Sequence, residues 1–297
     1  MFPFSLPAGK VCRGLLIACL LSLTTLSASA VSQTSGGKHC LWRITNAKAS
    51  VYLLGSIHIL RANDYPLPTV IDQAVQQAQQ FYFEIDPNKF DEYHRDVDAA
   101  SKLPHGVEIK DRVHPKTWNY LRTTARGGNF DWIHYKAWAI AQNVLAYPMH
   151  ELFSLDLGVD NYVVKKAKAR GRPMRGLESA AEHAAIFAGM NDVESESYLL
   201  RAIVYAGQTE GQIRDGIAAW KVGNTGKLAA LQEPPVREAP GLNARFLQWR
   251  NDRWLPVIEN VAKSNTPTLI VAGAAHFSGA HSVLSLLRER GYQIEQL

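Results

Sequence analysis

The stretch SVYLLGSIHIL, from Ser50 to Leu60, begins as an apolar run typical of a buried β-strand and continues into glycine, two further residues and histidine. A second stretch, TLIVAGAAHFSGAH from Thr268 to His281, repeats this pattern. In open α/β sheets, ligands bind at the carboxyl ends of the strands, where loops bring side chains together. We therefore expect an α/β fold in which His58 and His276, one after each strand, are neighbours in space.

Further strands and helices alternate along the chain. Strand-like runs are HCLWRIT, QFYFEID, RPMRGLES and YQIEQL, and segments with helical spacing of apolar residues separate them. The region from about Asp91 to Tyr162 is helical and aromatic without a clear strand. Three prolines predict an exposed loop from Leu231 to Gly241. The whole pattern predicts a central mixed sheet flanked by helices, with a large helical insertion.

The first thirty residues have the composition of a secretory signal peptide. Lys10 and Arg13 precede the apolar run GLLIACLLSLTTL, and the small residues ASA end at Ala30, where cleavage is expected. An uncleaved anchor is disfavoured because the run is shorter than the roughly 18 residues that a spanning helix needs. A lipoprotein signal at Cys19 is disfavoured because few residues separate it from Arg13. We expect residues 31–297 to form a single domain, periplasmic or secreted, with no membrane span after cleavage.

Composition limits what the mature chain binds and how it is stabilised. The 297-residue sequence has a formal net charge of +5, and removing Lys10 and Arg13 with no acidic residue lowers this charge to +3. So mild a charge, on basic residues spread along the chain, does not indicate nucleic-acid binding. Cys40 is the one cysteine left after cleavage, so the domain cannot form an intramolecular disulfide. Its stability must therefore come from its core.

A carboxylate joins the two histidines in a candidate metal site. Glu84 lies near the end of the QFYFEID strand. His58, Glu84 and His276 form a two-histidine, one-carboxylate set, which suits Zn, Mn, Co or Fe and leaves positions open for water and substrate. Gly55 and Gly273 lack a Cβ, so backbone or substrate can approach closely there. The alternative is that each histidine is a hydrogen-bonded structural residue at a strand end.

Two more segments supply candidate catalytic groups. Glu178 closes the RPMRGLES strand at the same expected edge of the sheet. In the helix LNARFLQWRNDRWLPVIENV, Arg250 and Asn251 fall within the apolar face. A guanidinium there needs a partner. It either forms a buried ion pair, for example with Glu178, or donates to the oxyanion that develops when water attacks a carbonyl. The other histidines singled out, in polar or helical settings, are expected to be surface or structural residues: His94, His105, His114, His134, His183 and His281.

The ordered segments YLLGSIH, YPLP, FYFEID, GRPMRGLES, RNDRW and AGAAHFSG resemble the TraB/GumN family, whose animal relatives are the Tiki proteases. The resemblance spans about Leu41 to the C-terminus. It implies an α/β fold and a metal-dependent hydrolase, with the Tiki branch cutting peptide bonds near a protein's N-terminus. It matches Arg250 and Asn251 to the family's R-N, which favours the oxyanion role. The family's Tyr and Asp in a late Y-x-x-G-D segment are Trp220 and Asn224 here, which puts any role of these two positions in doubt.

Together these observations predict an exported metal-dependent hydrolase that acts on a peptide or protein. His58, Glu84 and His276 hold the metal, and Glu178 accepts a proton from the metal-bound water. Arg250, with Asn251 beside it, stabilises the oxyanion. The sequence equally allows the roles of the two glutamates to be exchanged. The alternative from another class is a non-catalytic envelope protein that binds a peptide or polysaccharide in the same cleft. No G-x-S-x-G motif occurs, so a serine hydrolase is not supported.

Overall fold

Six strands form one mixed sheet in the computed structural model, which describes residues 37–124, 132–146, 153–205, 209–238 and 240–297. Their order across the sheet is β4-β3-β5-β2-β1-β6. The strands are Leu41–Ile44 (β1), Val51–Ser56 (β2), Gln80–Ile85 (β3), Met174–Glu178 (β4), Thr268–Gly273 (β5) and Ile294–Gln296 (β6). The predicted α/β class with a central mixed sheet is confirmed.

Four neighbouring strands, β4, β3, β5 and β2, run parallel, whereas β1 is antiparallel to both β2 and β6. All of β2 is buried, and so is β5 up to its last residue, as expected for central parallel strands that are covered on both faces. Ser56 lies opposite Gly273, and Ile85 lies opposite Glu178. The segments that follow the four parallel strands therefore emerge at the same edge of the sheet.

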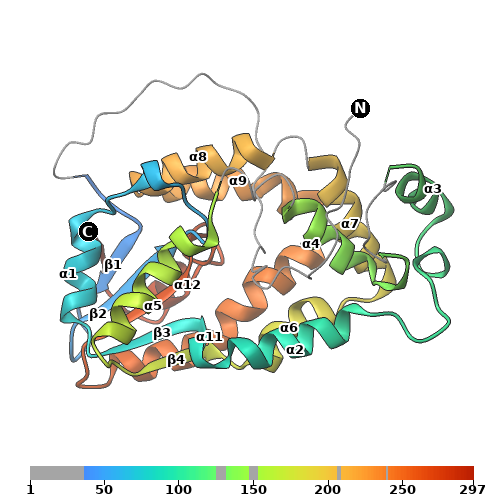
Figure 1. Ribbon diagram of the computed structural model, residues 1–297. Helices are drawn as coiled ribbons and strands as arrows, with labels where there is room; N and C mark the ends of the chain where they lie inside the picture. Colours follow the sequence, from blue (N-terminus) through green and yellow to red (C-terminus); the bar gives the residue numbers. More distant parts are fainter. Residues whose placement is uncertain (1–36, 125–131, 147–152, 206–208, 239) are drawn as a thin grey trace.

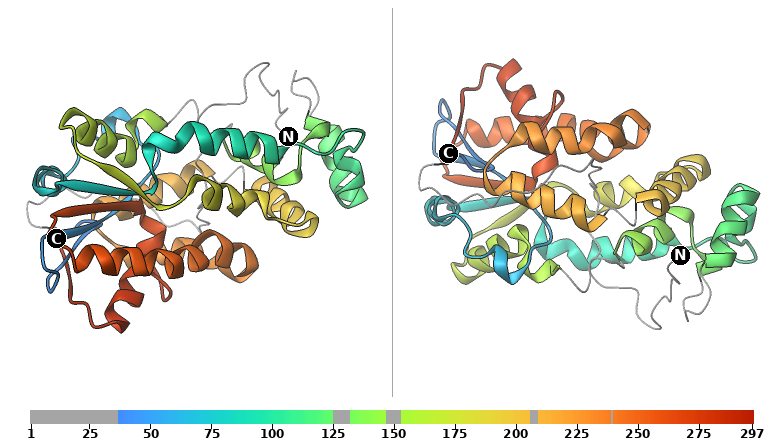
Figure 2. Two further views of the ribbon diagram at one scale, coloured as in Figure 1. Left: turned by 90° about the horizontal axis from the view of Figure 1, so that it is seen from below. Right: turned by 90° about the horizontal axis from the view of Figure 1, so that it is seen from above.

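Helices cover both faces of the sheet (Figures 1 and 2). One face carries α1 (Thr69–Gln77) and α5 (Val159–Ala169), and the other carries α11 (Trp249–Ala262) and α12 (Val283–Glu289). The main core lies between the sheet and these helices, and it includes Trp42, Phe81 and Trp254.

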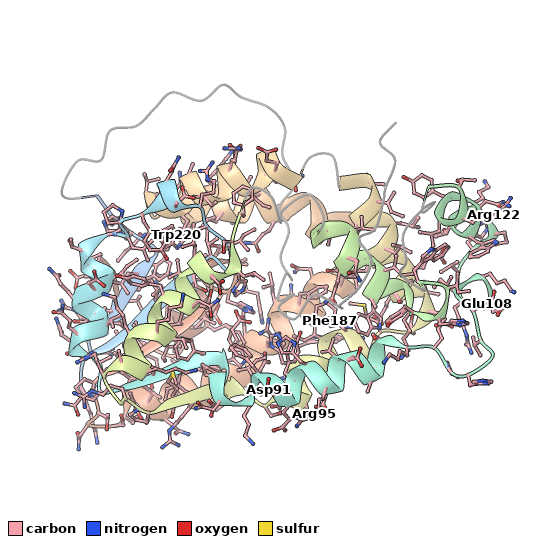
Figure 3. The ribbon with its side chains drawn as sticks, in the orientation of Figure 1. Asp91, Arg95, Glu108, Arg122, Phe187 and Trp220 are labelled. Carbon is pink, nitrogen blue, oxygen red and sulfur yellow. The ribbon has the colours of Figure 1, made fainter. Side chains whose placement is uncertain are left out.

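A second hydrophobic core lies in a helical part beside the sheet. The predicted insertion supplies α2 (Phe90–Ser101), α3 (Pro115–Thr124) and α4 (Ala137–Ala146), whereas α6 (Ala180–Ala188) and α7 (Asp192–Tyr205) follow β4. Helix α4 packs against α7, and α2 packs against α6. Within this core, Phe187 (Figure 3) stacks on Trp138 with a ring-centroid distance of 5.5 Å. Two separate stretches of the chain therefore build the helical part.

The segment from Leu231 to Gly241, predicted as a loop, is helical in its described residues. After α8 (Thr209–Lys221), α9 spans Thr225–Glu238 and α10 spans Pro240–Asn243. A proline in a helix interior costs about 3 kcal/mol relative to alanine, but α9 packs against both α8 and α10. Tertiary packing thus outweighs the local preference of the prolines.

Short helical turns connect the larger elements. The 3-10 turns are Ala62–Asp64, Pro87–Lys89, Ile109–Asp111, Trp132–His134, Leu155–Leu157 and Ala274–Phe277, and a π-helical turn at Ala244–Gln248 leads into α11. The predicted signal peptide, residues 1–30, lies outside the described part of the chain. Among the residues that are described, no helix is long and apolar enough to cross a membrane. Burial raises the pKa of the Cys40 thiol to about 12, as expected for an unreactive core cysteine.

Candidate functional site

The carboxyl edge of the parallel strands carries the residues that the sequence singled out. His58 lies two residues after β2, and His276 lies in the helical turn that follows β5. Glu84 is the next-to-last residue of β3, and Glu178 is the last residue of β4. Arg250 reaches this edge from α11 and contacts both glutamates. The fold therefore brings together side chains from five separate elements.

Arg250 is the centre of the buried part of this edge. Its Nη2 donates to Glu84 Oε2 and, over 2.6 Å, to Glu178 Oε1. Its Nε donates to Glu178 Oε1 over 3.0 Å, and its Nη1 donates to His276 Nε2 over 3.0 Å and to the Phe246 carbonyl over 3.2 Å. A guanidinium has five N–H donors, and these contacts occupy all five. The structure thus contains the buried ion pair that was one of the two interpretations of Arg250, and it leaves no free donor for an oxyanion in this arrangement.

Glu178 is enclosed by donors. Besides Arg250, Oε1 lies 2.6 Å from His183 Nδ1, and Oε2 accepts from Trp254 Nε1 over 3.2 Å. Burial raises the pKa of Glu178, but Arg250 and then His183 outweigh burial and lower this pKa to about 2. A carboxylate that is held ionised in this way is a weak proton acceptor. The structure therefore supports a role for Glu178 in anchoring Arg250 rather than a role as the catalytic base.

His183 on α6 is a buried member of this centre and not a surface residue. Burial and then Arg250 lower the pKa of His183, which keeps the ring neutral. Because Glu178 can only accept, Nδ1 of His183 carries the hydrogen between them. The other ring nitrogen, Nε2, and the hydroxyl of neighbouring Tyr93 are buried without a hydrogen-bond partner among the described residues.

One group of ligand-type side chains has the spacing of a metal site. Single ligand atoms of Glu84, Glu178 and His183 all lie within 4.8 Å of one another. The Arg250 Nη2 contacts both carboxylates and lies 3.2 Å from His183 Nδ1. The cationic guanidinium therefore stands where a cation bound by these three residues would be.

His276 is fixed by a chain of hydrogen bonds. Its Nε2 accepts from Arg250, so Nδ1 carries the hydrogen and donates to Asn251 Oδ1 over 2.6 Å. The Asn251 amide is oriented in turn because its Nδ2 donates to the His281 carbonyl over 2.7 Å. Burial and then Arg250 lower the pKa of His276 to about 3. The ring is therefore neutral at pH 7, with a lone pair on Nε2.

His58 belongs to the open part of the edge. Its Nδ1 lies 2.8 Å from Asp160 Oδ2, and the hydroxyl of Ser56 donates to the other oxygen of Asp160 over 2.8 Å. Burial lowers the pKa of His58, but Asp160 outweighs burial and raises this pKa to about 9. In either charge state Nδ1–H points at Asp160, which directs Nε2 away from the carboxylate.

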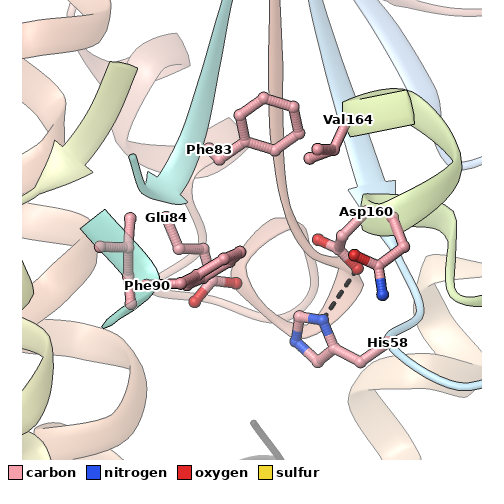
Figure 4. A pocket seen from close by; sticks show the side chains of 8 residues that line it. His58, Phe83, Glu84, Phe90, Asp160 and Val164 are labelled. Carbon is pink, nitrogen blue, oxygen red and sulfur yellow. Dashed lines mark hydrogen bonds and ion pairs between the residues drawn. The ribbon is translucent and has the colours of Figure 1, made fainter. Parts of the chain in front are cut away.

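A pocket opens between His58 and Glu84, which face each other across it (Figure 4). Asp160 and Asn161 add polar groups, and the remaining walls are apolar: Phe83, Ile85, Phe90 and Val164. The cavity volume is about 40 Å³. Since an ordered water needs roughly 10–15 Å³, the pocket has room for a few waters or a small chemical group.

The three predicted metal ligands surround Gly273. A Cβ added to this glycine would lie 3.3 Å from Glu84 Oε1, 3.6 Å from His58 Nε2 and 3.8 Å from His276 Cδ2. The Gly273 N–H itself donates to Glu84 Oε1 over 2.7 Å. At Gly55, a Cβ would lie 3.1 Å from the Cα of Ala274. The two glycines thus allow close approach, one to the candidate ligands and the other to backbone.

Two members of the edge were not identified from the sequence as site residues, namely His183 and Asp160. His183 follows Glu178 by five residues, across a helix start, and Asp160 lies in the first turn of α5. The start of α5 is joined to the segment that follows β2, because Val159 N donates to the Ile57 carbonyl over 2.9 Å. Neither residue has a sequence signal of its own, since both acquire their partners through tertiary packing.

Residues to which the sequence assigned no chemistry lie away from the pocket lining. His281 is exposed and lies 2.9 Å from Asp252. Trp220 (Figure 3) is buried, and its Nε1 donates to the Gly55 carbonyl over 2.6 Å. Asn224 accepts from the backbone of Lys227 at the start of α9. These contacts join structural elements and leave the three side chains without a part in the site.

Comparisons with known proteins match nearly the whole described chain to one family. The sequence profile of the TraB/PrgY/gumN family matches residues 40–296. An uncharacterized protein of Treponema pallidum (strain Nichols) is 22% identical over 305 aligned positions, which cover 94% of this chain and 90% of that protein. No solved structure gives a significant match.

Proposed function

Because the chain belongs to the TraB/PrgY/gumN family, we propose that it is an exported metal-dependent hydrolase that cleaves peptide bonds. The observation that carries this proposal is the arrangement around the pocket. His58 Nε2 and the Glu84 carboxylate face one cavity from opposite sides. His276 lies beside Gly273, with its Nε2 4.0 Å from Glu84 Oε1. Water and a small substrate group can enter the same space.

The residue types of the donor set suit a divalent cation of the Zn, Mn, Co or Fe type. The group whose ligand atoms all lie within 4.8 Å of one another is instead Glu84, Glu178 and His183, so the His58 and His276 rings would have to turn to hold an ion together with Glu84. Ligating histidines in proteins almost always donate their second ring N–H to a carboxylate or carbonyl. His58 does so to Asp160, and His276 does so to the side-chain carbonyl of Asn251. His58, Glu84 and His276 would hold the ion, and His276 would give up its hydrogen bond from Arg250 to do so. A bound cation would lower the pKa of a water molecule and polarise a substrate carbonyl.

The side chains around the pocket have separate parts in this proposal. Asp160 and Asn251 fix the orientation of the two histidine rings. Burial raises the pKa of Glu84, but Arg250 and then His276 outweigh burial and hold this pKa well below its usual range, so Glu84 is ionised. Glu84 lines the pocket and Glu178 does not, so Glu84 is the nearer of the two glutamates to hold the ion. Its lowered pKa makes it, like Glu178, a weak proton acceptor. Glu178 holds Arg250 in place.

The test is elemental analysis of the purified mature protein, combined with a broad peptide-cleavage screen with and without a chelator. We expect about one divalent ion per chain and cleavage that the chelator abolishes. His58→Ala should remove both, whereas His281→Ala, at an exposed histidine paired with Asp252, should remove neither. A His58→Ala protein with full metal content and turnover would refute the proposal. Binding of peptide or polysaccharide with no turnover and no metal requirement would instead favour the non-catalytic envelope protein.

Export is tested separately. We expect mass spectrometry of cell-envelope fractions to find a mature N-terminus at Val31, after a leader with the n-region, apolar region and cleavage site of a signal peptide. A cytoplasmic protein that retains Lys10 and Arg13 would contradict export and leave the proposed chemistry to its own test.

A further inference from the structure

Apolar side chains make up much of the pocket lining, and they lie beside the polar groups: Phe90 is next to Glu84, and Val164 is next to Asp160 (Figure 4). Phe83 and Ile85 come from β3, Phe90 begins α2, and Val164 comes from α5. The proposed chemistry needs polar groups alone, so it gives no reason for this concentration of apolar side chains.

The charges at the pocket are already paired. Asp160 is paired with His58 at 2.8 Å, and Glu84 is paired with Arg250. In the pocket without a bound cation, an acidic side chain would face the carboxylates of Glu84 and Asp160. A lysine ammonium would leave water for a space walled by two phenylalanines, with no unpaired carboxylate to compensate. An uncharged aliphatic group, in contrast, would gain from contact with all four apolar walls.

The size of the space sets a limit on this group. A cavity of about 40 Å³ holds about three ordered waters by volume. That is room for a short branched or unbranched aliphatic chain and too little for an aromatic ring in the present arrangement. Phe90 on α2 and Val164 on α5 both line the pocket. A larger or smaller side chain at either position therefore changes the volume of the pocket.

The geometry points to a specificity pocket: it binds a small aliphatic side chain of the substrate residue that adjoins the cleaved bond, and Val164 and Phe90 set the size accepted. This inference rests on the proposed function, because it places a substrate side chain beside the groups proposed to act on the neighbouring carbonyl. One methylene in such a pocket changes kcat/KM by about 10- to 200-fold.

The experiment uses the metal-loaded protein and two peptide series, in which the residue before or after the cleaved bond is Ala, Val, Leu, Asp or Lys. For one of the two positions we expect at least tenfold higher kcat/KM for Val or Leu than for Asp or Lys. Val164→Phe fills the pocket and should lower the Leu-to-Ala ratio about tenfold or more. Phe90→Ala enlarges it and should raise this ratio. Val204→Phe, at an exposed position on α7, is the control and should leave the ratio unchanged.

The outcomes separate the inference from the proposed function. If peptides are cleaved and the ratio is the same in Val164→Phe, Phe90→Ala and the unmodified protein, the pocket inference is overturned and the hydrolase proposal stands. If no peptide is cleaved, binding of N-acetyl-valine amide and N-acetyl-aspartate amide is measured by NMR on the unmodified and Val164→Phe proteins. Selective binding of the valine amide that Val164→Phe weakens supports the pocket without the hydrolase, and its absence overturns both. Thermal melting of each variant confirms that it is folded.

Discussion

Two histidine–carboxylate pairs lie at the carboxyl edge of the sheet, one closed and one open. In the closed pair, His183 Nδ1 is 2.6 Å from Glu178, and the side chains are 2% and 1% exposed. In the open pair, His58 Nδ1 is 2.8 Å from Asp160, and the side chains are 26% and 24% exposed. The contacts within the pairs are nearly the same, so their surroundings account for the difference between them.

The surroundings differ chiefly in Arg250. The guanidinium contacts Glu178 and lies 3.2 Å from His183, and after burial it is the main cause of the lowered pKa of His183. His58 is paired with Asp160, which raises its pKa to about 9. A histidine–carboxylate pair therefore anchors Arg250 through an ionised carboxylate beside a neutral histidine in one place, and presents a free ring nitrogen to a pocket in the other. A histidine–carboxylate pair indicates chemistry only when its second nitrogen reaches open space.

The largest expected effect is that of removing Arg250, whose guanidinium contacts the closed pair. Arg250→Met leaves two carboxylates, Glu84 and Glu178, buried without their cation, and breaking a buried pair in this way costs about 3–5 kcal/mol. We expect a loss of that size in the free energy of unfolding, measured by urea denaturation at pH 7. Arg253→Met is the matched control, because Arg253 is 47% exposed and lies 3.6 Å from the same Glu178. An exposed pair contributes about 0–1 kcal/mol, and equal losses in the two variants would contradict the closed character of the pair.

The next effect concerns the pH dependence of stability. Glu178 has a folded-state pKa of about 2 against an ordinary value of 4.5. Since the folded value is the lower one, the ionised carboxylate stabilises the fold above pH 4.5, and this contribution is lost as the pH falls toward 2. The loss is on the order of 3 kcal/mol. Urea unfolding between pH 6 and pH 2 should show a shallower decline for Glu178→Gln than for the unmodified protein. Parallel curves would show that Glu178 is not held ionised.

A smaller effect is expected in the open pair, and on function. Asp160→Asn removes the carboxylate that accepts from His58 and should weaken metal affinity or activity about 10- to 100-fold, with the free energy of unfolding changed by about 1 kcal/mol or less. Calorimetric metal titration and peptide cleavage measure this. The same substitution at an exposed histidine–aspartate pair, Asp252→Asn beside His281, should change neither quantity. If both variants behave alike, Asp160 does not position His58.

The smallest effect tests the glycine between the candidate ligands. Gly273→Ala adds a Cβ 3.3 Å from Glu84 Oε1 and 3.6 Å from His58 Nε2, so Glu84 must move by a few tenths of an ångström. We expect metal affinity to fall roughly threefold, since ligand sets depend on placement to within about 0.5 Å. Gly211→Ala, where an added Cβ meets nothing within 4 Å, is the control. An unchanged affinity in Gly273→Ala would place the metal elsewhere.

Much of the fold could be predicted because its signals are local. The apolar runs of β2 and β5 and their following histidines are visible in the sequence, and they indicate parallel strands that end at one edge. The loop prediction at residues 231–241 failed for the opposite reason. Proline there opposes a helix by a local cost, and the contacts that outweigh it come from α8 and α10, which the sequence of the segment does not contain.

The sequence by itself indicated five of the residues at the carboxyl edge, namely two histidines, two glutamates and an arginine on the apolar face of α11, but not His183 or Asp160. Only the tertiary structure decided how they pair. Arg250 lies 72 positions from Glu178 and 166 from Glu84 along the chain, and the strand order β4-β3-β5 places both carboxylates within its reach. The same order leaves Glu84 at the pocket and encloses Glu178. Charge partners are chosen by distance in space and by exclusion of water, and neither quantity is encoded in the spacing of residues along a chain.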